Sequence, residues 1–516
     1  MDLPPPAPPA LAPAGRHVEP VLLALPLDRI AEAGLGAASQ PGVVHADVRV
    51  HALRTFEVRL HDAVPERLAD DVVLGVAVRV VVDGAYGFAA GVDVAPAAVV
   101  ALTRRAVAMG RHTARLGARP LAWAYEPVWR DTWLSAYELD PFDVPADERL
   151  DLLADRSQRL LAAPGIQHVE TSCTAVREAT FYADLAGSRL LQQRVRVGSD
   201  LTALSLGPDG SPETLRTLAP PAGRGWEWLT AGPAAGCWDW DDELARLPEL
   251  LAERHAAPSV EPGTYDLVIA PSNLWLTIHE SVGHATELDR VLGYEANYAG
   301  TSFVGADQVG RLQYGSAAMT VTGDRTTPHG LATVGYDDEA VAAQEWTLVD
   351  SGVLAGFQLD RRMALERGLG RSNGCAYADS PLHVPVQRMP NVSLAAAPGG
   401  PDVGELIAGV RDGIYIEGDK SWSIDMQRYN FQFTGQRFWR IRDGALAGQL
   451  KDVAYQATTT DFWNSLEAVG GPQTYVLGGA LNCGKGQPGQ VAPVSHGCPA
   501  GLFRSVRVLN TAGGQA

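Results

Sequence analysis

One segment of the sequence, residues 266–289, restricts the local fold more than any other part of the chain. It reads DLVIAPSNLWLTIHESVGHATELD, which is typical of a buried strand, a Pro-Ser-Asn break and then a helix. His279 and His284 lie five residues apart on this helix, and a regular α-helix would separate them by roughly 140°. Both side chains can reach one point only on a distorted helix. We therefore predict a π-type bulge between them, helped by Gly283.

The pattern His-Glu-x-x-x-His indicates a zinc site. Zinc binds neutral imidazole nitrogens and thiolates, and a hydrolytic site needs three protein ligands and an open position for water. His279 and His284 supply two of these ligands, and Glu280 is placed to take a proton from water and later to donate it to a leaving amine. The alternative is that the histidines are half-buried and bonded to backbone carbonyls, with Glu280 an ordinary exposed helix residue.

The third ligand must come from a distant part of the chain, and Cys483 is our choice. It lies in GGALNCGKGQPGQV, where glycines allow the backbone to turn closely around a site and Lys485 can favour the thiolate. Cys498, in SHGCPAG, is the alternative, and His496 beside it can bind the metal or stabilise charge. Glu287 is set aside because it lies only three residues beyond His284. The remaining cysteines are interpreted as small buried hydrophobic residues: Cys173, Cys237 and Cys375.

Length and composition limit the class of protein. A chain of 516 residues exceeds what one hydrophobic core holds, so we expect two or three domains. A net charge of -18 disfavours nucleic acid and anionic membranes as partners, and no window resembles a membrane-spanning helix. Five scattered cysteines and the absence of an export signal predict a soluble cytoplasmic protein.

Hydrophobic patterns predict an α+β fold, with an N-terminal mixed α/β region followed by a β-rich C-terminal domain that carries the helix of His279. Strands are expected over 43–88, with an Asp-Gly turn, and over 168–184 and 190–200, and helices over 95–116, 146–163 and 241–257. The predicted divisions are a Pro/Ala-rich tail at 1–20, a domain at 21–240 with sub-blocks near 40–115 and 120–235, a candidate linker at 219–236, and a metallopeptidase domain at 241–516.

Several of these segments together resemble the TldD/PmbA family of bacterial and archaeal metallopeptidases. The resemblance runs through nearly the whole chain and includes LGVAVRVVVDGAYGFAAG, HESVGHATELD, AGTSF, VGYDDEA, GIYIEG and NCGKGQPGQVAPVSHG. With the catalytic TldD branch as the model, it implies zinc bound by His279, His284 and Cys483, and Glu280 as the catalytic glutamate.

The resemblance also implies an activity and a partner. The activity is hydrolysis of peptides and of unfolded or modified polypeptides, and the partner is a second copy or a PmbA/TldE-like subunit that lacks the metal motif. Two alternatives stay open: the chain is itself a non-catalytic partner subunit, or it holds a structural zinc ion in a closed site with four ligands. The intact His279, Glu280, His284 and Cys483 argue against the first.

Overall fold

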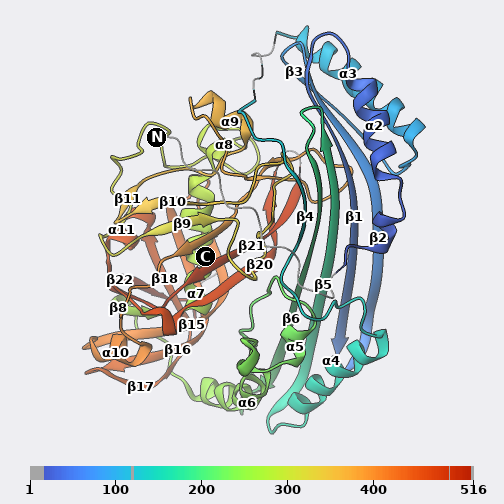
Figure 1. The fold of residues 1–516 in the computed structure, drawn as a ribbon. Coiled ribbons are helices and arrows are strands. Elements are labelled where there is room, and N and C mark those ends of the chain that lie inside the picture. Colours follow the sequence, from blue (N-terminus) through green and yellow to red (C-terminus); the bar gives the residue numbers. More distant parts are fainter. Residues whose placement is uncertain (1–16, 118–120, 122, 487–488, 513–516) are drawn as a thin grey trace.

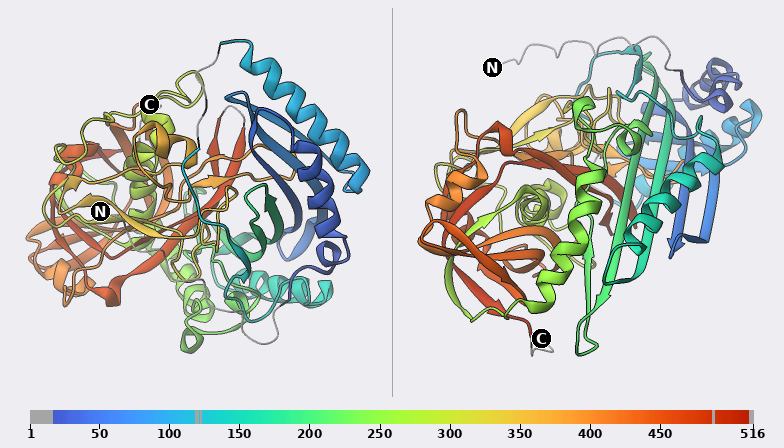
Figure 2. Two further views of the ribbon diagram at one scale, coloured as in Figure 1. Left: turned by 45° about the horizontal axis from the view of Figure 1, so that its top comes forward. Right: turned by 90° about the horizontal axis from the view of Figure 1, so that it is seen from below.

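The computed structural model describes residues 17–117, 121, 123–486 and 489–512 (Figure 1). Most of the predicted Pro/Ala-rich tail, residues 1–16, lies outside the described residues, and α1 (Pro20–Leu23) is the first element within them. An N-terminal sheet with helices on one face stands beside a β-rich C-terminal region that contains the helix of His279 (Figures 1 and 2). The predicted α+β fold class is confirmed.

A seven-stranded sheet organises the N-terminal region. Its strands are, in sheet order, β3 (Ala85–Gly91), β2 (Val64–Val82), β1 (Val43–His61), β5 (Ile166–Asp184), β6 (Arg189–Leu206) and β4 (Arg130–Leu134), with β7 (Pro212–Arg216) also on β6. All neighbours are antiparallel except β4 and β6. Because β1 pairs with β5 from Asp47–Asp184 to His61–Glu170, the two predicted sub-blocks share one sheet.

Three helices cover one face of this sheet: α2 (Leu27–Ala38), α3 (Pro96–Ala114) and α4 (Ala146–Leu161) (Figure 1). The first two pack over β1 and β2, where Ile30 and Val99 join Val48 and Val78 in one buried cluster. Leu153 of α4 packs in a second cluster lower on the sheet. The alternating apolar pattern of the strands therefore supplies one face for the helices.

The segment predicted as a linker, residues 219–236, is packed instead. It contains α5 (Glu227–Thr230) and η1 (Pro233–Ala235), and Trp226 and Leu229 are buried in the cluster of α4. The prediction was wrong because these apolar side chains outweigh the Gly and Pro content of the segment. The following helix, α6 (Trp240–Ala256), adds buried leucines to the same cluster. The domain boundary near 240 stays a prediction.

The C-terminal region is built around a closed ring of strands. β8 (Gly263–Ile269) pairs with β15 (Asp412–Ile424) and β22 (Gly501–Asn510), and the ring closes through β18 (Val453–Thr458) and β16 (Asn430–Arg442). Helix α7 (Pro271–Ile278) lies inside it and is seen end-on in the right panel of Figure 2. Leu274 and Ile278 of α7 pack with Phe431, Phe433 and Phe503. The helix of His279 is therefore held on several sides by apolar strands.

Smaller elements complete this region. The ring is extended by β17 (Ala445–Leu450) and β19 (Leu466–Val469), and a four-stranded sheet has the order β11 (Val353–Leu354), β10 (Glu345–Asp350), β9 (Val321–Asp324), β14 (Asn391–Leu394). Two short pairs are β12 (Ala376–Tyr377) with β13 (Val386–Gln387), and β20 (Val476–Lys485) with β21 (Gln490–Cys498). The short helices are α8 (Leu288–Val291), α9 (Arg361–Glu366), α10 (Val403–Ala408), α11 (Thr459–Asn464) and η4 (Pro472–Thr474).

Buried ion pairs join the N-terminal sheet to the C-terminal region. Arg79 of β2 donates to Asp47 of β1 over 2.8 Å and to Glu339 over 2.9 Å, and all three side chains are buried. Arg49 of β1 bonds to Asp338 over 2.6 Å. A buried charge is tolerated only with partners in place, so these contacts fix the inner face of the sheet against the C-terminal region.

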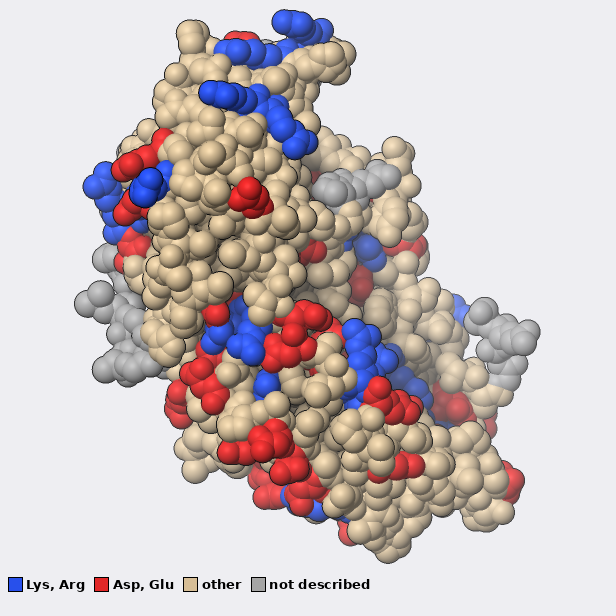
Figure 3. All heavy atoms as spheres, turned by 90° about the vertical axis from the view of Figure 1, so that its right-hand side faces the viewer, with Lys and Arg blue, Asp and Glu red and all other residues tan. Residues whose placement is uncertain are grey.

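The opposite face of the sheet, with its helices, carries basic and acidic side chains next to one another (Figure 3). One such pair joins the strands themselves, where Arg54 of β1 donates to Asp70 of β2 over 2.8 Å. On this face the basic side chains do not merge into the continuous surface that a nucleic acid would need. Within the described ranges, every helix is too short or too polar to cross a membrane.

Candidate metal centre

The predicted helix distortion is present between the two histidines. α7 ends at Ile278, a π-helical turn (η2) runs from His279 to Gly283, and a 3₁₀ turn (η3) spans His284–Thr286. The prediction of a π-type bulge is confirmed. The extra residue turns His284 towards the face of His279, and their ring centroids lie 4.6 Å apart.

Side chains hold the π turn in place. The Ser281 hydroxyl donates to the Thr277 carbonyl, Tyr314 donates to the Ser281 carbonyl, and the Gln358 amide donates to the Gly283 carbonyl over 2.6 Å. These bonds satisfy backbone groups that a regular helix would satisfy internally. A Cβ at residue 283 would lie 2.6 Å from the Met389 sulfur, so a larger residue there would have to displace this buried side chain.

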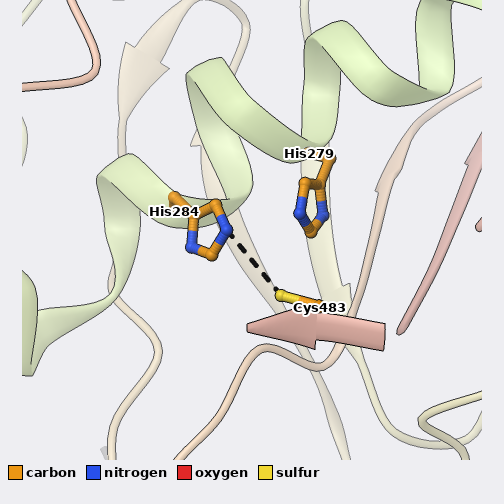
Figure 4. A group of neighbouring side chains, drawn as sticks. All are labelled: His279, His284 and Cys483. Atoms are coloured by element: carbon orange, nitrogen blue, oxygen red, sulfur yellow. Dashed lines mark hydrogen bonds between the residues drawn. The ribbon is translucent and has the colours of Figure 1, made fainter. Parts of the chain in front are cut away.

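The structure brings His279, His284 and Cys483 together (Figure 4). One ligand-type atom from each lies within 4.8 Å of the others, and the Cys483 sulfur is 3.7 Å from Nε2 of His284. The histidines come from η2 and η3, and Cys483 comes from β20. All three residues are buried. Two imidazoles and one thiol form a donor set that suits zinc.

A chain of hydrogen bonds fixes which nitrogen of His279 faces the group. Nδ1 of His496 lies 2.9 Å from the Val392 carbonyl, which can only accept, so this nitrogen carries the proton. Burial lowers the pKa of His496 to about 4, so its ring is neutral and Nε2 accepts from Nδ1 of His279 over 2.7 Å. His279 is left with an unprotonated Nε2, which is the form that binds a metal.

A buried carboxylate orients His284 in the same way. Nδ1 of His284 bonds to Glu287 over 2.8 Å, which leaves Nε2 directed towards Cys483 (Figure 4). Burial favours the neutral acid, but Lys485 and His284 hold the pKa of Glu287 well below its usual range. Lys485 also bonds to Asp289 over 2.7 Å. The position of Glu287 in the sequence argues against it as a ligand, and its role as an orienting residue is not predicted from the sequence.

Burial sets the protonation state of the three grouped side chains. It lowers the pKa of His284 to about 3 and that of His279 well below the ordinary value, so both rings are neutral as metal binding requires. Burial raises the pKa of the Cys483 thiol to about 11, against the opposing charges of Arg388 and Lys485. A bound metal ion deprotonates a coordinating thiol outright. The residues therefore fit a zinc ion in their protonation as well as their type.

Glu280 is buried beside this group, at the start of the π turn. Its Oε2 atom accepts a hydrogen bond from Nη1 of Arg428 over 3.0 Å. Burial raises the pKa of Glu280, while the positive charge of Arg428 acts in the opposite direction. A glutamate with a raised pKa is suited to take up and release a proton near neutral pH.

The alternative ligands lie elsewhere or are engaged. The Cys498 sulfur lies 3.7 Å from the Pro271 carbonyl and is not part of the group. His496 contacts the group through His279 only. The other three cysteines, Cys173, Cys237 and Cys375, are buried and free.

Within the described ranges, one further group of side chains could bind a metal: His61, Asp62 and His168, called here the exposed group. The Asp62 carboxylate lies 2.8 Å from Nδ1 of His168 and 3.5 Å from Nε2 of His61. These side chains are 31–54% exposed, at the hairpin between β1 and β2 and at the start of β5.

Two family models match the chain. The PmbA/TldA metallopeptidase C-terminal domain matches residues 262–510, and the PmbA/TldA metallopeptidase domain 1 matches residues 46–110. The chain belongs to the TldD/PmbA family of metallopeptidases, as the resemblance in sequence indicated.

Curated relatives agree with this assignment. A metalloprotease of Methanothermobacter thermautotrophicus is 27% identical, over 91% of this chain and 96% of the relative. A zinc metalloprotease TldD homolog of Saccharolobus solfataricus is 24% identical, over 52% of this chain and 57% of the relative. The solved structure of TldE from Thermococcus kodakarensis has a TM-score of 0.69 at 15% identity, covering 93% of this chain and 99% of that one.

Proposed function

We propose that this member of a metallopeptidase family is itself a zinc-dependent peptidase, with His279, His284 and Cys483 as ligands and Glu280 as general base. The observation that carries the proposal is the buried group of two neutral imidazoles and one thiol with a buried glutamate next to it. Zinc bound there would lower the pKa of water and polarise a peptide carbonyl. Glu280 takes a proton from the attacking water and gives it to the leaving amine.

The composition of the group supports a catalytic site over a structural one. A structural zinc site has four protein ligands, whereas the described residues bring three to this point. The remaining position is available to water or substrate. Glu287 and His496 also hold the two histidines in a fixed orientation through hydrogen bonds. A catalytic site requires ligands that keep their geometry during the reaction.

The substrate we propose is an unfolded or modified peptide that binds as an added strand. Among the described residues, β20 has a single strand neighbour, β21, and β20 carries Cys483 itself. Strand addition at such an edge recognises backbone groups and so requires an extended segment. If a compact folded protein were cut as fast as an unstructured peptide, this part of the proposal would be wrong.

For the assembly, we propose a homodimer or a heterodimer with a PmbA/TldE-like subunit, supported by the likeness to the TldE fold. A cytoplasmic location is supported by five free cysteines, because exported proteins of this size commonly form disulfides. The intact metal group favours the catalytic role over that of a metal-free partner subunit.

The test compares the wild-type protein with Glu280→Gln, and with Glu249→Gln as a matched control on an exposed site of α6. We expect one tightly bound zinc in all three proteins, and hydrolysis of an unstructured peptide that falls by about 10²–10⁴-fold in Glu280→Gln alone. Zinc content is measured by atomic emission, and hydrolysis by chromatography. Full activity in Glu280→Gln, or wild-type protein that takes up no zinc, would contradict the proposal.

A further inference from the structure

Arg428 forms a side-chain hydrogen bond with Glu280, the proposed general base. It lies in the turn between β15 and β16, and its Nη1 atom donates to Glu280 over 3.0 Å. Its Nε atom is buried and has no hydrogen-bond partner among the described residues. A buried N–H without a partner is costly, so this guanidinium has a donor to offer beside Glu280.

The turn that carries Arg428 is rigid and strained. The Asp425 carboxylate accepts from the backbone N–H groups of Gln427, Tyr429 and Asn430 over 2.8–3.0 Å. The Arg428 carbonyl accepts from the Thr459 hydroxyl over 2.7 Å. Arg428 has φ +63°, a left-handed conformation that is strained for a residue with a Cβ. Glycine would adopt this conformation without strain. We therefore attribute the presence of arginine here to the function of its side chain.

Other cations near the group are already engaged. Lys485 contacts the carboxylates of Glu287, Asp289 and Glu295. Arg290 pairs with Glu287 and Glu295. Arg388 donates through Nη1 and Nη2 to the carbonyls of Gln490 and Cys483, although its Nε atom, like that of Arg428, has no partner among the described residues. These contacts hold the cations to groups that keep their charge or dipole throughout a hydrolysis. Arg428 differs because its partner, Glu280, loses its charge on taking up a proton.

We propose that Arg428 is a catalytic residue that stabilises the oxyanion formed during peptide hydrolysis. The inference rests on the proposed function. A proton of the attacking water passes to Glu280, the water oxygen bonds to the peptide carbon, and the carbonyl electron pair moves to its oxygen. Glu280 is then neutral and holds Arg428 less strongly, while the new oxyanion attracts it. The negative charge thus moves from one partner of the guanidinium to another.

The second half of the reaction reverses this exchange. The oxyanion re-forms the carbonyl, the bond from carbon to nitrogen breaks, and the proton on Glu280 passes to the leaving nitrogen. Glu280 regains its charge and its bond to Arg428. The planar guanidinium group has five N–H donors in a fixed arrangement. A small rotation of the group is therefore enough to exchange one oxygen partner for the other. Lysine, with a compact charge on a flexible stem, replaces this geometry poorly.

The experiment uses Arg428→Gln and Arg428→Lys, which have the same backbone strain as arginine in the turn, and Arg504→Gln as a matched control. Arg504 pairs with Asp266 and Glu467 in the C-terminal region. We expect kcat to fall about 10²–10³-fold in Arg428→Gln, as on removal of one oxyanion donor, with KM within about threefold and zinc content unchanged. Arg428→Lys should recover only part of the loss. Arg504→Gln should match the wild type.

A transition-state analogue separates a catalytic from a positioning role. A peptide with a phosphinate in place of the scissile bond should bind Arg428→Gln more weakly by the same factor that kcat/KM falls, whereas binding of the cleaved product should not change. Full activity in Arg428→Gln, or analogue affinity that does not follow kcat/KM, would overturn the inference and leave the peptidase intact. Wild-type protein that binds zinc but neither cleaves the peptide nor binds the analogue would overturn the proposed function, and this inference with it.

Discussion

The two groups that could bind a metal have similar side chains and very different surroundings. His279, His284 and Cys483 are buried and come from a π turn, a 3₁₀ turn and a distant strand. The exposed group, His61, Asp62 and His168, lies at the end of the N-terminal sheet, with side chains 31–54% exposed. Ligand-type atoms are close together in both groups. Proximity alone therefore does not distinguish a metal centre from a surface cluster.

The two groups differ in the hydrogen bonds that hold their ligand side chains in place. In the buried group, each histidine bonds through Nδ1 to a residue outside the group, so that Nε2 of His284 lies towards Cys483 and Nε2 of His279 is left unprotonated. In the exposed group, the Asp62 carboxylate occupies Nδ1 of His168 and also accepts from the backbone N–H of Val169 over 2.8 Å. A metal there would have to displace bonds among its own ligands. Tight binding is therefore expected only where other residues orient the ligands.

Removal of one side chain from each group tests this difference most directly. Three ligands share a zinc binding free energy of about 10–16 kcal/mol, so losing one costs about 4 kcal/mol, or roughly a thousandfold in affinity. We expect Cys483→Ala to show this loss in competition with a chromophoric chelator, and His168→Ala to bind zinc as the wild type does. Equal losses in the two variants would place the tight site outside the buried group.

The orienting bond to His279 provides the second test. Removing an orienting partner of a metal-bound histidine lowers metal affinity by about 10–100-fold, and we expect this from His496→Ala. Cys498→Ala is the matched control, because Cys498 is also buried and lies on β21 with His496, but it does not contact the group. If Cys498→Ala weakened zinc binding and His496→Ala did not, Cys498 would be the ligand and our assignment would be wrong.

Much of the fold could be predicted because local patterns decide it. The alternation over residues 43–60 became β1, and the helical spacing over 146–163 became α4. The same holds for the π turn, because the five-residue spacing of His279 and His284 leaves little else possible if both are to face one point. The glycine-rich surroundings of Cys483 favour it as the third ligand, and the structure places it beside both histidines. Its role as a ligand stays a prediction.

What could not be predicted depends on contacts across long distances in the chain. Arg428 lies 148 residues from Glu280, and His496 lies 217 residues from His279. Neither has a local pattern that indicates its contact, because each depends on how the ring of strands closes around α7. Glu287 was within reach, since residues three apart on a helix are neighbours. The three-residue spacing, which argues against Glu287 as a ligand, is the spacing that lets its carboxylate bond to His284.

The smallest expected effect concerns the stability of the metal-free protein at mildly acidic pH. An unfolded histidine has a pKa near 6.5, whereas burial lowers the pKa of His496 to about 4 in the folded protein. The unfolded state therefore binds more protons below about pH 6.5, so the stability contributed by the neutral ring is complete above that pH and is lost as the pH falls. Between pH 7.5 and pH 6.0 the loss is about 0.8 kcal/mol for this one ring.

Urea unfolding in the presence of a chelator, at these two pH values, measures the effect as the difference between wild type and His496→Ala. The difference is needed because burial raises the pKa of Asp337 and of Asp360, and a raised carboxyl pKa makes stability rise as the pH falls. Subtracting the variant cancels these carboxyl contributions and leaves that of His496. A difference that does not shrink on acidification would mean that the ring is not held neutral. His496 could then not accept the hydrogen bond from His279. The proposed difference between the buried group and the exposed group would be wrong for this histidine.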